Sequence, residues 1–365
     1  MKNWLASMAL CGTLMTAAAF AEEEAVVHVY NWNDFIGETT VEDFQKATGI
    51  QVVYDVYDSN DVLEAKLLAG KSGYDVVFPS AHPNGRRQIK AGLLQPVDRA
   101  RLTGWSNLDE KILRNLESAD PGNQYLVPYM WGSSGVGYNV AKVQEMLGPE
   151  APVDSWSLIF DPASAEKLAG CGIAVLDEAA ESVPAMLAWL GRDPRDLSRE
   201  SLEAAAAGFA AIRPHIRYFH SSQYINDLAN GDICVAMGYS GDIQQAADRA
   251  EESGSGIEIR YVIPKEGAQI ATDVMAIPMD APHPGNAHTF IDFMLKPEVI
   301  AAATNYVAYP NANKAATGLV DEDLRNDPGV YPPPDVMGRL FIVEVDEGRP
   351  MRDLTRTWTR IKTGR

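Results

Sequence analysis

The chain has 365 residues, and its 31 lysines and arginines are outnumbered by 50 aspartates and glutamates, which gives a formal net charge of −19. This acidic balance argues against nucleic acid or an anionic membrane surface as a partner, and it is compatible with a cationic ligand or simply with solubility. The length favours about two domains with substantial cores.

Residues 1–21 have the pattern of an export signal. Lys2 gives a positive start, an apolar stretch follows, and Ala19-Phe20-Ala21 fits a cleavage site. The apolar stretch is too short for a comfortable membrane span. We therefore expect an exported protein in which Cys171 and Cys234 form a disulfide, because exported proteins meet an oxidising compartment.

The N-terminal third alternates strand and helix patterns. Short β-branched or alternating runs predict strands, and amphipathic runs that end at glycine predict helices. The predicted strands are residues 26–30, 50–57 and 75–78, and the predicted helices run from the capping-box pattern Thr39-x-x-Glu42 to Gly49 and over residues 61–69. This β-α-β-α-β order implies a parallel sheet with right-handed crossovers.

A second series of elements follows residues 128–132. The predicted strands are 172–176, 233–238, 257–262 and 274–278, and the predicted helices are 183–190, 202–212, 242–251 and 284–295. We expect an α/β fold of two lobes with a cleft between them. The expected lobes are residues 26–131 plus about 252–308, and residues 132–251 plus about 309–365.

An aromatic ring stands beside a carboxylate at two predicted strand ends. Trp32 and Asp34 follow the first strand, and Tyr239 and Asp242 follow the strand 233–238. The carboxyl ends of strands in an α/β sheet are where ligands usually bind. A ring attracts positive charge through its quadrupole, and a carboxylate supplies the counter-charge, so this pairing suits an organic cation.

Other polar groups recur at similar places, and each has a structural alternative. They are Ser80, Asp177, Glu181, Asp273 and the segment from Tyr309 to Asn313. Asp242 could be a helix N-cap, Asp177 and Glu181 could offset a helix dipole, and Asn313 could serve a turn. Trp32 alone could be half-buried packing. The recurrence of carboxylates at strand ends favours a ligand site.

Motifs of catalysis are not found in the sequence. It has no G-x-S-x-G, H-E-x-x-H or G-x-x-x-x-G-K-[ST] pattern, and its six histidines are scattered. Paired carboxylates and rings could also suit a glycosidase, but no acid has an apolar local setting that would raise its pKa for general-acid work. We therefore expect a binding protein with no catalytic residue, no cofactor and no metal.

The chain resembles the periplasmic polyamine-binding proteins of bacterial ABC transporters, most closely the putrescine-binding branch. The resemblance covers the mature chain, and its most specific stretches are VYNWNDF (29–35), YDVYDSNDVLEAKLLAGKSGYDVVFPS (54–80), SADPGNQYLVPYMWG (118–132) and YFHSSQYINDLANGDICVAMGYSGDI (218–243). It implies a type II periplasmic-binding fold that closes on its ligand by hinge motion. It also implies a polyamine ligand and an inner-membrane ABC permease as partners, and we expect a monomer.

The resemblance also implies roles for individual residues. Trp32 and Tyr239 would flank the aliphatic stem of the ligand, and Asp242 would bind one ammonium group. The other ammonium would be bound by Asp273 with help from Asp34, Ser80 and Glu181, and the pocket would be lined by Asn33, Phe35 and Tyr309. Cys171 and Cys234 fall where the family has a disulfide.

The chain departs from the family pattern near the site. Ala271 stands where a large aromatic residue is usual, Asn33 and Phe35 replace Ser and Tyr, and the loop 81–87 is one residue longer. A missing ring leaves room at one end of the pocket. The hypothesis is weaker putrescine binding, or a preference for a longer or bulkier cation such as spermidine or agmatine. A periplasmic polyamine sensor is the alternative to a transport protein.

Overall fold

The computed structural model describes residues 23–345 and 348–364, so the predicted export signal at residues 1–21 lies outside the described residues. The strands are β1 (Val26–Trp32), β2 (Gln51–Tyr57), β3 (Val76–Val77), β4 (Leu94–Gln95), β5 (Val127–Asn139), β6 (Ile173–Val175), β7 (Tyr218–Phe219), β8 (Val235–Tyr239), β9 (Ile259–Val262), β10 (Ala268–Met275), β11 (Ile277–Pro278) and β12 (Leu340–Phe341). The helices are α1 (Thr40–Thr48), α2 (Asn60–Leu68), α3 (Arg86–Lys90), α4 (Glu110–Leu116), α5 (Val140–Leu147), α6 (Ser157–Phe160), α7 (Pro162–Leu168), α8 (Ala179–Trp189), α9 (Arg199–Ile212), α10 (Tyr224–Asn230), α11 (Ser240–Glu252), α12 (Pro284–Met294), α13 (Pro297–Val307), α14 (Glu322–Asn326), α15 (Pro334–Met337) and α16 (Arg349–Thr363). Among these described helices, none combines the length and the hydropathy that a membrane crossing needs.

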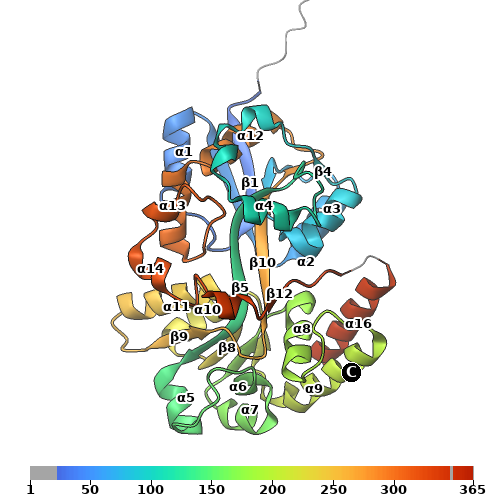
Figure 1. Ribbon diagram of the computed structural model, residues 1–365, viewed down its shortest axis with the longest axis vertical. Coiled ribbons are helices and arrows are strands. Elements are labelled where there is room, and N and C mark those ends of the chain that lie inside the picture. The colour runs from blue at the N-terminus through green and yellow to red at the C-terminus, as the bar shows by residue number, and fades with distance from the viewer. Residues whose placement is uncertain (1–22, 346–347, 365) are drawn as a thin grey trace, which may run out of the picture.

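The chain forms two bodies stacked along its long axis (Figure 1). The upper body carries α1, α12 and α13, and the lower one carries α5, α6, α7 and α9. The long strands β5 and β10 run from one body into the other, and they pair antiparallel. The expected α/β architecture is therefore present, and the segment between α13 and β12 makes a further crossing between the bodies.

The smaller sheet confirms the parallel arrangement predicted from the N-terminal third. β1 lies between β2 and β3 and is parallel to both, with Trp32 opposite Tyr57. Gly49 ends α1 in the left-handed region with φ 75°, as the helix pattern predicted. The predicted capping box at Thr39 is wrong, because the Thr39 side chain accepts no hydrogen bond from the helix backbone, and its hydroxyl donates to the Asp43 side chain. The parallel order brings the residues after β1 and β3 to one edge of the sheet.

Like the helices α13 and α16, strand β5 is one of the elements that the sequence patterns did not predict. Its 13 residues include three glycines, which interrupt the alternation of apolar side chains. A Cβ at Gly135 would lie 2.6 Å from the Tyr261 hydroxyl, and one at Gly137 would overlap the Ile243 side chain. The glycines let a ring and a helix pack directly on the strand, and this close packing removes the usual strand signal.

The larger sheet has the order β12-β10-β5-β8-β6-β7, with β9 also paired to β5. In the β5–β10 pair, Ala271 lies opposite Gly132 and Asp273 lies opposite Met130. In the β5–β8 pair, Tyr239 lies opposite Ser134. These registers bring the two segments with predicted site residues, β10 and the end of β8, alongside β5 in the middle of the molecule.

The buried apolar side chains form separate clusters. One cluster draws on residues 136–268 and 341–361, and two adjoining clusters draw on residues 27–130 and 274–320. The predicted lobe ranges stay a prediction. The clusters differ from them in two segments, since residues 259–268 pack with the lower body and residues 309–320 pack with the upper one.

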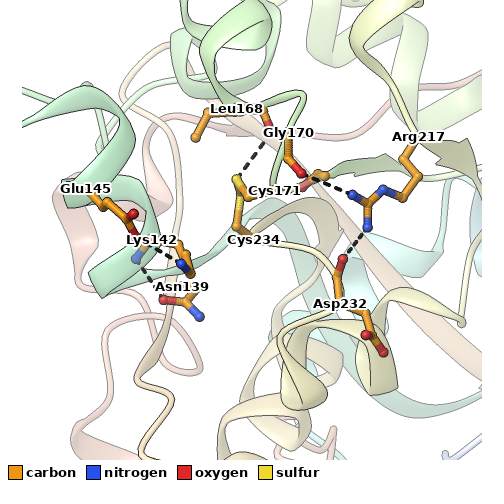
Figure 2. The surroundings of a disulfide bond; sticks show 10 residues. Asn139, Lys142, Glu145, Leu168, Gly170, Cys171, Arg217, Asp232 and Cys234 are labelled. Carbon is orange, nitrogen blue, oxygen red and sulfur yellow. Dashed lines mark hydrogen bonds and ion pairs between the residues drawn. A yellow bond between two sulfur atoms is a disulfide. The ribbon is translucent and has the colours of Figure 1, made fainter.

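The predicted disulfide between Cys171 and Cys234 is confirmed, with 5.5 Å between the two Cα atoms. It joins the turn after α7 to the residue before β8. Figure 2 shows Arg217 beside it, donating to the carbonyl oxygens of Gly170 and Asp232. The bridge and the guanidinium together fix the lower sheet to the helix that precedes it, away from the candidate site.

Candidate functional site

A cavity in the middle of the molecule gathers nearly all predicted ligand-binding residues. Those that line it are Trp32, Asn33, Phe35, Ser80, Glu181, Tyr239, Asp242, Asp273 and Tyr309. The cavity has a volume of about 50 Å³, which is room for a few waters or a small linear molecule.

At one end of the cavity, two tyrosine hydroxyls hold the Asp242 carboxylate. Tyr224 donates to Oδ2 at 2.5 Å and Tyr309 donates to Oδ1 at 2.6 Å. Burial raises the pKa of both tyrosines well above its usual value, so the hydroxyls remain donors. Tyr239, and not Asp242, occupies the N-cap of α11, so the N-cap alternative for Asp242 is wrong.

Two glycines make room for the ring of Tyr309. A Cβ at Gly241 would overlap that ring, and a Cβ at Gly132 would lie 2.9 Å from it. The ring also packs edge-on against Phe35, with 4.8 Å between ring centroids. The glycines thus allow a side chain from the loop after α13 to reach a carboxylate on α11.

Aromatic side chains from the smaller sheet form one wall. The indole nitrogen of Trp32 donates to the Phe78 carbonyl at 2.7 Å, and the Tyr57 hydroxyl donates to the same oxygen at 2.5 Å. The Trp32 and Tyr57 rings are tilted by 50° with their centroids 4.7 Å apart. Both rings are therefore fixed before any ligand enters, which lowers the entropy cost of binding against them.

The other end of the cavity contains Asp273 and Glu181. Ser80 donates to Asp273 Oδ1 at 2.7 Å, which links the loop after β3 to β10. Gln269 donates to Glu181 Oε1 at 2.7 Å, whereas Glu181 Oε2 has no hydrogen-bond partner within the described residues. Ala271 lines the wall between these acids. The carboxylates at this end therefore have fewer hydrogen-bond donors than the carboxylate of Asp242 has.

Burial raises the pKa of all three carboxyl groups, so the expectation that no acid lies in a setting that raises its pKa is wrong. The pKa of Asp242 is raised to about 6, that of Asp273 to about 7 and that of Glu181 to about 8. The Asp242 charge adds to the rise at Asp273. Among the described residues that line the cavity, none is lysine or arginine. A cationic ligand would supply the missing counter-charge, because a buried carboxylate is costly without a partner.

Two predicted candidates lie outside the cavity lining. Asp34 has a left-handed backbone with φ 53°, and its carboxylate lies 3.3 Å from the Arg249 guanidinium of α11. This ion pair joins the loop after β1 to α11, and the predicted help of Asp34 to Asp273 stays a prediction. Asp177 accepts from Lys362 and from the indole of Trp358, so its role is to anchor α16.

The cavity also contains residues that were not predicted, namely Tyr57, Asp58, Gly132, Ser221 and Ser222. Tyr57 and Asp58 end a predicted strand with a ring and a carboxylate, so the pattern seen at Trp32 and Tyr239 would have found them. The Asp58 carboxylate lies 3.7 Å from the His220 ring. The two serines lie in a loop, and no sequence signal distinguishes them.

Comparisons with known proteins agree with this geometry. The family model described as bacterial extracellular solute-binding protein matches residues 39–332. A putrescine-binding periplasmic protein of Pseudomonas aeruginosa is 50% identical over 361 residues, 99% of this chain and 98% of that protein. A putrescine-binding periplasmic protein of Escherichia coli is 47% identical over 367 residues, 100% of this chain and 99% of that protein. The solved structure of a spermidine/putrescine ABC transporter substrate-binding protein of Streptococcus pneumoniae has a TM-score of 0.73 at 27% identity, covering 93% of this chain and 98% of that one.

Proposed function

The chain belongs to the bacterial extracellular solute-binding proteins, and we propose that its solute is a polyamine, which it captures in the periplasm for an ABC permease. It is a periplasmic binding protein and not an enzyme, as the sequence analysis expected. The fold class that the sequence predicted is likewise confirmed by the solved relatives.

The observation that carries the proposal is the pairing of buried carboxylates with fixed rings in a cavity that has no basic side chain in its described lining. A linear polyamine has ammonium groups separated by an aliphatic stem. Each ammonium needs a carboxylate and hydrogen bonds when it leaves water, and the stem needs an apolar wall. An anion would meet three buried acids, and a neutral sugar would leave them without a counter-charge.

We propose a role for each of these residues, and the geometry described above supports it. Asp242, held by Tyr224 and Tyr309, binds one ammonium group. Trp32 and Tyr239 flank the stem and add cation–π attraction. The remaining lining residues complete the wall.

The opposite ammonium group meets the second set of acids. Asp273, held by Ser80, is its first partner, and Glu181 offers a buried oxygen that has no partner within the described residues. Asn33 and Phe35 also line the cavity, and Phe35 packs against Tyr309 at the Asp242 end.

The end of the cavity that contains Asp273 and Glu181 favours a cation longer than putrescine as a second candidate ligand. Ala271 leaves space beside Asp273, and Glu178, one helical turn before Glu181, also has a buried oxygen without a described partner. Burial and nearby acids raise the pKa of Glu178 well above its usual value. A third ammonium group, as in spermidine, or a guanidinium, as in agmatine, would neutralise this group of acids.

We further propose that lobe closure is the functional step and that the protein acts as a monomer. The lobes follow the buried clusters, residues 26–130 and 274–320 in one and residues 136–268 and 341–361 in the other. Asp242 lies on α11, which packs in the lower lobe, and Asp273 is followed on β10 by Val274, which packs in the upper lobe. A ligand that binds both carboxylates therefore favours the closed arrangement of the lobes. A sensor role would use the same closure, and uptake assays in a deletion strain distinguish the two.

Calorimetry of the ligand-free mature protein tests the proposal. We expect 1:1 binding of putrescine or spermidine with micromolar affinity or better, and more than about a hundredfold weaker binding of n-butylamine, because one carboxylate end is then left unpaired. Equal binding of n-butylamine and putrescine, or binding of a neutral sugar, would overturn the proposal.

A further inference from the structure

Two histidines and an aspartate converge at the start of the smaller sheet, away from the cavity. His28 lies in β1, Asp75 immediately precedes β3, and His283 is the N-cap residue of α12. Each offers one ligand atom, and the three atoms lie within 4.8 Å of one another. The sequence suggested no such site because Asp75 and His283 are 208 positions apart.

The backbone holds the Asp75 carboxylate in place. This side chain is fully buried, and it accepts from the His28 N–H at 2.8 Å and from the His283 N–H at 2.5 Å. Its Oδ2 also lies 3.1 Å from the Nδ1 of His283. The two imidazole rings stack with centroids 5.9 Å apart and planes 15° apart. The backbone N–H groups of His28 and His283 thus fix the position of the Asp75 carboxylate.

A purely structural role for Asp75 does not require the imidazoles. Its contacts with the two backbone N–H groups would form with almost any residue at positions 28 and 283. Within the described residues, neither ring nitrogen of His28 has a hydrogen-bond partner, although the ring is half-buried beside a buried carboxylate. Two imidazoles and one carboxylate that share a small volume are a set of metal ligands.

We propose that His28, Asp75 and His283 bind a divalent transition-metal ion, with Zn²⁺ as the ion to test. Imidazole nitrogen with one carboxylate suits zinc and its neighbours, whereas Mg²⁺ and Ca²⁺ prefer sets of oxygen ligands. The 3.1 Å between His283 Nδ1 and Asp75 Oδ2 is close to the roughly 3.3 Å that separates two ligands of a tetrahedral zinc ion. Rotation of the partly exposed His28 ring would bring its nitrogen to the ion as the third protein ligand.

The ion would join β1, the segment before β3 and the start of α12. His28 lies four residues before Trp32 on the same strand, which is about 13 Å along it. The metal therefore stabilises the upper body without touching the polyamine cavity, and this inference stands independently of the ligand's identity.

Calorimetric titration of Zn²⁺ into the chelator-treated mature protein, with and without saturating putrescine, tests the inference. We expect one site whose affinity is unchanged by putrescine and falls at least tenfold in His28→Gln and in His283→Gln. His215→Gln, a histidine outside the cluster, is the matched control and should bind zinc normally. Zinc should also raise the thermal midpoint of the wild type more than that of either cluster variant.

Two results would overturn the inference. One is the absence of any zinc site with a dissociation constant below about 1 mM. The other is unchanged zinc affinity in both cluster variants, which would place the ion elsewhere. If Asp273→Asn lost zinc affinity instead, the ion would lie in the cavity. Circular dichroism of each variant confirms that the fold is retained, so that a loss of affinity reports on the ligands themselves.

Discussion

The two ends of the central cavity differ in how completely their acids are satisfied. At the first end, both oxygens of Asp242 accept from tyrosine hydroxyls, and two glycines make room for one of these tyrosines. At the second end, Asp273 accepts from Ser80, but Glu181 keeps a buried oxygen without a described partner beside Ala271.

This difference suggests that one end decides which class of ligand binds and that the other end decides which member of the class binds best. We propose that the first end, whose carboxylate is held by two tyrosines, binds one ammonium group and so selects an organic amine. We propose that the second end, with its spare carboxylate oxygen and Ala271, selects among amines of different length. Substitutions at the first end should therefore reduce affinity for every polyamine, whereas those at the second should change the ranking.

Asp242→Asn should have the largest effect. Loss of the charge leaves a buried ammonium group without its partner, which costs about 2–5 kcal/mol, so we expect all polyamines to bind at least about thirtyfold more weakly. Calorimetry measures the effect, with Asp177→Asn as the matched control that should bind normally. Retained affinity in Asp242→Asn would mean that the first end does not bind the ammonium group.

Gly241→Ala should weaken binding through geometry alone. The added methyl group overlaps the Tyr309 ring and moves its hydroxyl away from Asp242, at a cost of about 1–3 kcal/mol. We expect roughly ten- to hundredfold weaker binding with a folded protein. Gly318→Ala, where a Cβ meets open space, is the control. Equal affinities in the two variants would contradict the positioning role of Tyr309.

The affinity should fall as the pH is lowered. In the free protein Asp242, Asp273 and Glu181 have pKa values raised to about 6, 7 and 8, so they hold protons that an ammonium ligand must displace. We expect at least tenfold weaker binding at pH 5.5 than at pH 7.5, with proton release detected by calorimetry in two buffers. An affinity that does not change with pH would contradict buried, proton-carrying acids.

The same carboxyl groups should make the ligand-free fold less stable as the pH rises. Their pKa values in the folded protein lie above those of the unfolded chain, so the folded state binds more protons. Their contribution is therefore present near pH 4 and is lost as the pH rises through about 6 to 8. Urea unfolding of the ligand-free protein at several pH values measures this loss, and bound polyamine should reduce it.

Ala271→Phe should have the smallest effect on affinity and the clearest effect on selectivity. The ring fills the space beside Asp273, so we expect the ratio of putrescine to spermidine affinity to rise about five- to tenfold, near 1 kcal/mol. Ala271→Ser, which adds little volume, is the control. An unchanged ratio would show that the second end does not set the ligand's length.

Much of the lining of this cavity could be predicted because local sequence patterns indicate where the strands end. Trp32 and Asp242 follow strands whose apolar alternation is clear, and the strand ends of an α/β sheet meet where ligands bind. Tyr57 and Asp58 follow the same rule and could have been included. The disulfide followed from the count of cysteines in an exported chain.

The remainder depends on geometry that no local pattern encodes. Strand β5 was missed because its glycines accommodate rings from distant segments. Asp34 was placed in the site because it neighbours Trp32, but its left-handed backbone accompanies an ion pair with Arg249. The pairing of His28 with His283 likewise arises only when the sheet has formed.

Mass spectrometry of the small molecule that co-purifies with the native, folded protein tests the central claim most directly. The account predicts an amine with at least two amino or guanidino groups, bound at one molecule per chain and lost from Asp242→Asn. A sugar, an anion or a monoamine at the same stoichiometry, still present in Asp242→Asn, would contradict it.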